Sequence, residues 1–142
     1  MKISYRCKIE QQDDKKFLVT FSDFEEAFTE GDTYEEALFN AEEVLNLTLE
    51  GRMEEGIRIP VPTLKSEEGE EIFPSPPIQS ALLVKFSRGK HTIADLARSL
   101  ETSWPAVARI EDPRHWSSLK QLSKAATALG QKLILSFENQ HK

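Results

Sequence analysis

The spacing of apolar residues changes once along this 142-residue chain, and the change coincides with a proline-rich segment. Before that segment, apolar and polar residues alternate as in strands with one buried face, and after it apolar residues recur every three or four positions as in helices. Most of the seven prolines lie between Pro60 and Pro77, around an acidic cluster at residues 67–71, which is typical of a linker. The sequence therefore predicts an α+β chain of two domains, residues 1–74 and 78–142.

The first domain is predicted to contain a small antiparallel sheet. Residues 3–9 and 17–21 alternate between apolar and polar positions, and the turn between them makes the pair a β-hairpin. A short third strand is expected over residues 26–29, and a further one is possible around residues 71–74. Cys7 occupies an inward position and is the only cysteine, so we expect a packed thiol in a reducing, cytoplasmic setting.

A long helix is predicted to follow the third strand. Thr33 and Glu36 have the spacing of a capping box, in which each side chain accepts a hydrogen bond from the other residue's backbone N–H. Gly56 is the expected end of this helix. One apolar stripe along it is expected to be buried: Tyr34, Leu38, Ala41, Leu45, Leu49 and Met53.

The second domain is predicted to consist of helices followed by a terminal strand. The helices are expected over residues 78–88, 92–100, 103–111 and 117–129. Residues 132–138 return to alternation, and a single strand has no sheet to join within a helical domain. We therefore expect this segment to pair with its counterpart in a second copy, within a homodimer or tetramer.

Residues 92–111 carry the strongest local motif. The close crossing of two short helices needs a small side chain, which Ala97 supplies, and the second helix has a polar outer face. The segment resembles the Cro/repressor-type helix-turn-helix at these positions: Leu96, Ala97, Leu100, Ser103, Val107, Arg109, Ile110 and Glu111. Glu101 stands where that pattern has its turn glycine, which predicts strain or a changed turn.

This resemblance implies binding to operator DNA through the second helix of the motif. The positions expected to face bases are Ser103, Trp104, Ala106 and Arg109, and those expected near phosphates are Thr92, Arg98 and Arg114. Ile93, Trp104 and Pro105 depart from the usual pattern. Trp104 could meet thymine methyl groups or pack against a neighbouring subunit, and the alternative interpretation is a helical dimerisation module that does not touch DNA.

The two halves carry opposite charge. Residues 1–74 hold 8 Lys and Arg against 19 Asp and Glu (net −11), whereas residues 75–142 hold 10 against 5 (net +5). An acidic half attracts basic proteins and repels nucleic acid, and a basic half can approach phosphate. The split indicates a different partner for each half.

The first domain also resembles the HicB-type antitoxins of type II toxin–antitoxin systems. The stretches that carry the resemblance are Phe17–Phe24, Ala27–Leu38 and Asn40–Glu42, in which a nine-residue core, Thr-x-Gly-Asp-Thr-x-Glu-Glu-Ala, is intact. Ser22 and Glu26 replace the usual Pro and Gly. Some members continue into a proline-rich connection and a helix-turn-helix, so the resemblance covers nearly the whole chain.

The HicB resemblance implies a partial ribonuclease-H-like domain that has lost catalysis and binds a HicA-type toxin, a small basic ribonuclease. Complementary charge would favour such an encounter. We expect the toxin to contact the approach to the third strand: Asp23, Phe24, Glu25, Glu26 and Glu30. The protein would then neutralise the toxin and repress its own operon. The alternative is a stand-alone helix-turn-helix regulator with an N-terminal sensing or interaction domain.

Enzymatic activity is not expected. A ribonuclease-H mechanism needs clustered carboxylates that hold metal ions, yet the outward positions of the first strand are Ser4, Arg6, Lys8 and the terminal Glu10. No metal-ligand spacing links the three histidines, His91, His115 and His141. We expect no cofactor, no signal peptide and no membrane span, and therefore a cytoplasmic protein.

Overall fold

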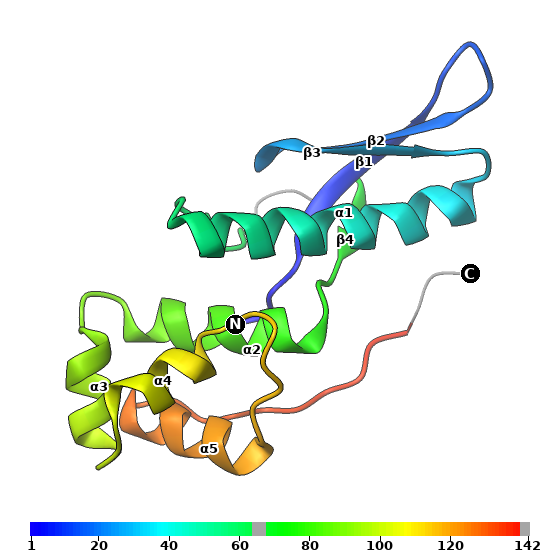
Figure 1. Ribbon diagram of the computed structural model, residues 1–142. Coiled ribbons are helices and arrows are strands. Elements are labelled where there is room, and N and C mark those ends of the chain that lie inside the picture. Colours follow the sequence, from blue (N-terminus) through cyan, green and yellow to red (C-terminus); the bar gives the residue numbers. More distant parts are fainter. Residues whose placement is uncertain (64–67, 140–142) are drawn as a thin grey trace. The chain divides into compact units, whose positions relative to one another are not determined.

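A computed structural model describes residues 1–63 and 68–139 of the chain (Figure 1). Two residues named in the predictions lie outside the described residues: His141, one of the three histidines, and Glu67, the first residue of the acidic cluster. The chain divides into two compact units, essentially Lys2–Pro74 and Ser75–Glu138. The first is a four-stranded antiparallel sheet with one helix and the second is helical, so the predicted α+β class is confirmed.

The sheet of the first unit has the strand order β3-β2-β1-β4, with every pair antiparallel. Its strands are β1 (Tyr5–Gln11), β2 (Phe17–Phe21), β3 (Phe24–Gly31) and β4 (Glu70–Ile72). The β1–β2 hairpin is confirmed, with Cys7 opposite Phe21 and Gln11 opposite Phe17. The third strand is longer than predicted. It begins three residues after the end of β2, and its pairing with β2 continues across an irregularity near Phe21.

Helix α1 (Tyr34–Glu55) packs on this sheet, chiefly over β3. The Thr33 hydroxyl accepts the N–H of Glu36 at 3.1 Å, as predicted, but the Glu36 carboxylate accepts the N–H of Asp32 rather than that of Thr33. Only half of the predicted capping box is therefore formed, because the Glu36 side chain reaches one residue further back. The helix ends at Gly56 in the left-handed conformation, with φ 71°, as expected for a helix stop.

A close approach between strand and helix fixes the start of α1. A Cβ atom on Gly31 would lie 2.5 Å from the backbone nitrogen of Ala37, so the β3–α1 connection leaves no room for a side chain. Below it, the rings of Tyr5 and Phe24 meet edge to face with their centroids 4.9 Å apart, and both side chains are buried. The Tyr5 hydroxyl donates to the Pro60 carbonyl at 2.7 Å, which ties the segment after α1 to this core.

The second unit contains the four predicted helices. They are α2 (Pro76–Arg88), α3 (Ile93–Ser99), α4 (Trp104–Ile110) and α5 (Leu119–Ala128). Their shared core holds Val84, Leu96, Ala97, Val107, Ile110 and Ala125. Ala97 is buried, which agrees with its predicted place at a close helix crossing.

The predicted terminal strand is not formed in the single chain. Residues 131–139 have no regular secondary structure among the described residues. A strand is stabilised by the hydrogen bonds of its ladder, and the helical unit supplies no strand to pair with. Large apolar side chains in this segment are therefore left in solvent: Ile134, Leu135 and Phe137.

Candidate functional site

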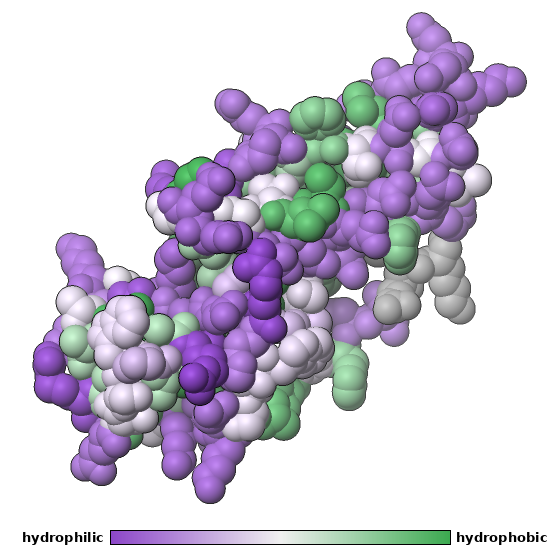
Figure 2. Space-filling model, in the orientation of Figure 1, coloured by the Kyte–Doolittle hydropathy of each residue, from purple (hydrophilic) through white to green (hydrophobic). Residues whose placement is uncertain are grey.

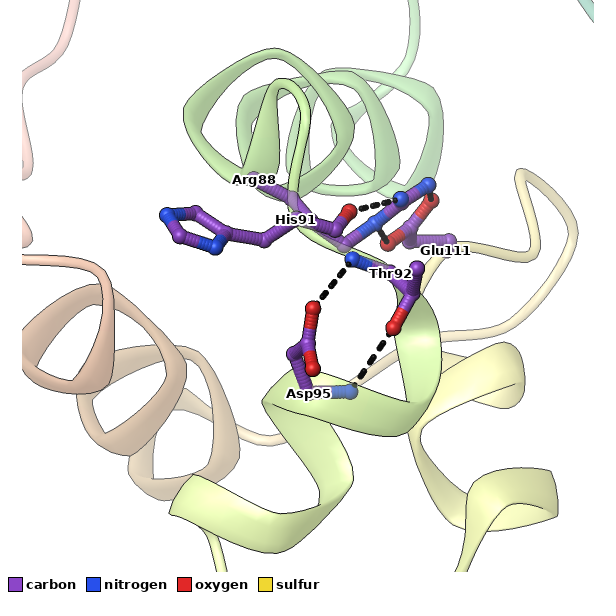
Figure 3. A network of polar contacts seen from close by, with 5 residues as sticks. All are labelled: Arg88, His91, Thr92, Asp95 and Glu111. Atoms are coloured by element: carbon purple, nitrogen blue, oxygen red, sulfur yellow. Dashed lines mark hydrogen bonds and ion pairs between the residues drawn. The ribbon is translucent and has the colours of Figure 1, made fainter.

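Helices α3 and α4 are each started by a side-chain cap. The Thr92 hydroxyl accepts the N–H of Asp95 at 3.0 Å, and the Asp95 carboxylate accepts the N–H of Thr92 at 3.0 Å, which completes a capping box (Figure 3). Ser103 caps α4 by accepting the N–H of Ala106 at 3.3 Å. These caps fix the first turns of both helices. Thr92 and Ser103 therefore have a structural role, and both are also among the residues predicted to contact DNA.

The turn between α3 and α4 contains a strained residue. Glu101 has φ 51°, in the left-handed region that glycine adopts more readily than residues with a Cβ atom. The sequence predicted strain or a changed turn at this position, and the structure shows a glutamate whose backbone is in the left-handed region. The Thr102 N–H closes the turn on the Ala97 carbonyl at 3.0 Å.

Arg88 and Glu111 form a bidentate ion pair between the C-terminal ends of α2 and α4. The guanidinium donates to both carboxylate oxygens, at 2.6 and 2.9 Å, and donates a third bond to the His91 carbonyl at 2.6 Å (Figure 3). Arg88 therefore joins the end of α2, the approach to α3 and the C-terminal end of α4. The sequence did not reveal this pair, since the two residues belong to different predicted helices.

The residues predicted to contact DNA lie on α3, α4 and the loop that follows. Trp104 is 54% exposed, and Ser103 and Arg109 are exposed on the same short helix or its cap, whereas Ala106 is half-buried. Arg98 is exposed and pairs with Asp95 one turn earlier on α3. Arg114 lies in the loop after α4, where its backbone N–H donates to the Asp112 carboxylate at 2.9 Å.

The residues predicted to contact a toxin differ in accessibility. Phe24 is fully buried beneath the Arg52 guanidinium, whose carbon lies 4.9 Å from the ring centroid, so its ring is not on the surface of the described chain. Glu26 accepts two hydrogen bonds from Arg52, both 2.7 Å, which lower the pKa of its carboxyl to about 2. Glu30 pairs with Lys16 at 3.3 Å. The other two residues are Glu25, which is exposed, and Asp23, which is half-buried.

Three large apolar side chains on β3 and α1 are exposed, which was not predicted. Phe28 on β3 is 63% exposed, and Phe39 and Leu47 on α1 are 65% and 69% exposed. The face drawn in Figure 2 shows small apolar patches within a mainly hydrophilic surface. For Phe39 and Leu47 the signal was present in the sequence, since both lie off the predicted apolar stripe of α1.

Comparison with known proteins decides the family. Residues 4–84 match the model of the HicB-like antitoxin of bacterial toxin–antitoxin systems, which takes in the whole sheet, α1 and most of α2. The chain belongs to the HicB-like antitoxin family. The match to Antitoxin HicB 1 of Photorhabdus laumondii is 32% identical over 94% of this chain and 86% of that protein. Antitoxin HicB 2 of the same organism is 34% identical over 92% of this chain and 94% of its own length. Antitoxin HicB of Escherichia coli is 29% identical over 84% of this chain and 88% of that protein.

No group of three or more His, Cys, Asp or Glu side chains is placed to hold a metal ion within residues 1–63 and 68–139. Cys7 is buried, and burial raises the pKa of its thiol to about 12, as expected for a packed thiol. None of the described helices is both long and apolar enough to cross a bilayer.

Proposed function

We propose that this HicB-like antitoxin binds and neutralises a small HicA-type mRNA-cleaving toxin, and that it represses its own operon by binding operator DNA. The observation that carries the proposal is the similarity to antitoxins called HicB, which covers 86% and 94% of the length of two of them, together with the family match over residues 4–84. The protein would act by binding alone. The opposite charges of the two halves, −11 and +5, support two different partners.

The acidic first unit is the proposed toxin-binding part. The acidic residues at the approach to β3 and along it would meet a cationic RNA-binding surface: Asp23, Glu25, Glu26 and Glu30. Glu26 is held in place by Arg52, so its carboxylate is both ionised and oriented. Strand β3 is also the end strand of its sheet in the described chain, and such an edge offers backbone groups to a partner.

The second unit is the proposed DNA-binding part. Its α3–α4 arrangement would place α4 in the major groove, with Ser103, Trp104, Ala106 and Arg109 toward bases and Thr92, Arg98 and Arg114 toward phosphates. The short capped helices, the buried Ala97 and the exposed Arg109 support this assignment. The net charge of +5 over residues 75–142 would favour phosphate contact.

Dimerisation through the C-terminal segment is part of the proposal. Residues 132–138 would form an antiparallel ladder with the same segment of a second copy, in a homodimer or a tetramer built from it. The exposed apolar side chains of this unit support such a surface: Trp116, Leu119, Ile134, Leu135 and Phe137. Two recognition helices would then read half-sites about 34–36 Å apart.

Co-expression with the adjacent small, basic open reading frame tests the proposal. The neighbour alone should arrest growth, and this protein should restore growth and co-purify with the neighbour. A harmless neighbour, or one that does not bind, would argue against the antitoxin role and favour a stand-alone regulator.

A further inference from the structure

The outer flank of α1 exposes two large apolar side chains on one helix. Phe39 and Leu47 are 65% and 69% exposed, and they lie eight residues apart, which places them on the same half of the helix surface about two turns from each other. A single exposed apolar residue is ordinary. Two on one flank of a helix offer a partner two anchor points.

The remaining positions of this flank are mostly acidic. It carries Glu35, Glu36, Glu43, Glu50 and Glu54. Beside it, partial burial and the neighbouring Glu43 raise the pKa of the Glu42 carboxyl. Two copies of such a flank brought face to face would place carboxylates against carboxylates, which opposes self-association. The charge of the flank fits a cationic partner.

The flank adjoins the outer edge of β3, with which none of the described strands pairs. The Asn40 side-chain amide, on α1, donates to the Glu30 carbonyl of β3 at 2.8 Å, so this side of the helix reaches the outer margin of the sheet. Leu47 follows Asn40 by seven residues, two helical turns, and therefore lies on the same side. Successive residues of a strand direct their backbone groups to opposite edges, so Phe28 shares the outward edge with Glu30.

We propose that the outer flank of α1, with Phe39 and Leu47 as apolar anchors, forms with the β3 edge one continuous docking surface for the cationic toxin. This inference rests on the proposed antitoxin function and adds a second element to the predicted contact. The glutamates steer the cationic surface of the toxin during encounter, and burial of the two apolar side chains slows dissociation. The surface thus combines fast association with a stable complex.

The test compares two double variants of the full-length protein against purified toxin by isothermal titration calorimetry. The F39S/L47S variant should bind the toxin about 100-fold more weakly, as expected when two buried anchors are lost. The matched control is I57S/V61S, which removes two apolar side chains of the same unit that are 46% and 49% exposed but lie off α1. The control should stay within about twofold of the unchanged protein, and far-UV circular dichroism should show both variants folded.

The outcomes separate the docking surface from the antitoxin role. Equal toxin affinity of F39S/L47S and the unchanged protein would overturn the docking surface and leave the antitoxin role intact. Absence of toxin binding by the unchanged protein would overturn both. A lower oligomeric state of F39S/L47S in sedimentation, with unchanged toxin affinity, would make the flank an interface between copies and overturn the inference as well.

Discussion

Arg88 and Glu111 are joined by two hydrogen bonds of 2.6 and 2.9 Å, although 23 residues separate them in the sequence. Their side chains are 17% and 9% exposed, so the pair is largely shielded from solvent. Because Arg88 also holds the His91 carbonyl, it fixes the ends of three helices with one guanidinium (Figure 3). The orientation of α3 and α4 therefore depends on a residue outside the predicted helix-turn-helix segment, residues 92–111.

Arg88→Met should destabilise the second unit. The Glu111 carboxylate would keep its burial and lose its ionic partner, which we expect to lower the free energy of unfolding by about 2–3 kcal/mol. Urea unfolding followed by tryptophan fluorescence measures this unit selectively, since both tryptophans, Trp104 and Trp116, lie in it.

The matched control for this prediction is Arg98→Met. Arg98 pairs with Asp95, but its side chain is 72% exposed, so its loss should cost less than about 1 kcal/mol. An equal decrease in the free energy of unfolding of the two variants would show that the Arg88–Glu111 pair stabilises the fold no more than an exposed ion pair does.

Glu101→Gly should stabilise the second unit. A residue with a Cβ atom pays for the left-handed conformation at φ 51°, and glycine does not. Part of the gain is offset by the greater freedom of glycine in the unfolded chain, so we expect a net increase of about 0.5–1 kcal/mol in the free energy of unfolding. Thr102→Gly, at the next position, lacks the positive φ and should destabilise; a gain there equal to that of Glu101→Gly would contradict the strain at Glu101.

The contribution of Glu26 to stability should depend on pH. Arg52 lowers the pKa of Glu26 to about 2 in the folded chain, below its ordinary value near 4.5. A carboxyl group whose pKa is lower in the folded state stabilises the fold at pH values above its unfolded-state pKa. This stabilisation is lost as the pH falls from about 4.5 toward 2. Because the Glu26 side chain is 49% exposed, we expect at most about 1 kcal/mol.

The free energies of unfolding of Glu26→Gln and of the unchanged protein should therefore differ most at neutral pH and become equal near pH 2. Tyrosine fluorescence follows the first unit, which contains both tyrosines, Tyr5 and Tyr34. Glu25→Gln is the control, since this exposed neighbour lies outside the ion pair with Arg52. A difference between Glu26→Gln and the unchanged protein that stays constant with pH would contradict the assigned cause.

Much of the local structure could be predicted from the sequence, since it depends on neighbouring residues. The starts of helices follow from Thr33, Thr92 and Ser103, whose side chains accept the N–H groups that the first helical turn leaves unpaired. The terminal strand could not be judged from one chain, because alternation predicts a strand only where a partner completes its ladder.

The orientation of the β3 side chains was harder to predict. Regular alternation along a strand would place Phe24 and Phe28 on the same face of the sheet, yet Phe24 is fully buried and Phe28 is 63% exposed. The register explains this: Phe24 lies opposite Phe21 and Phe28 lies opposite Thr20, so the irregularity between them changes the face. A bulge depends on pairing with another strand, and a period-two pattern does not contain it. The Arg88–Glu111 pair likewise depends on how separate helices pack.

Arg109→Ala should separate the two proposed activities. Loss of one exposed cation from α4 should weaken operator binding, by about 1–3 kcal/mol if Arg109 contacts a base. Toxin neutralisation should be unchanged, since Arg109 belongs to the other unit. Gel-shift titration on the DNA upstream of the operon and the growth assay measure the two effects separately. Simultaneous loss of both activities would contradict the division of labour.

Neutralisation of the toxin is the central claim, and cleavage of RNA by the purified toxin tests it most directly. The toxin is incubated with an mRNA substrate and titrated with this protein, and the uncleaved RNA is measured. We expect cleavage to stop when the two proteins reach a stoichiometric ratio. Undiminished cleavage in the presence of excess protein would contradict the antitoxin function.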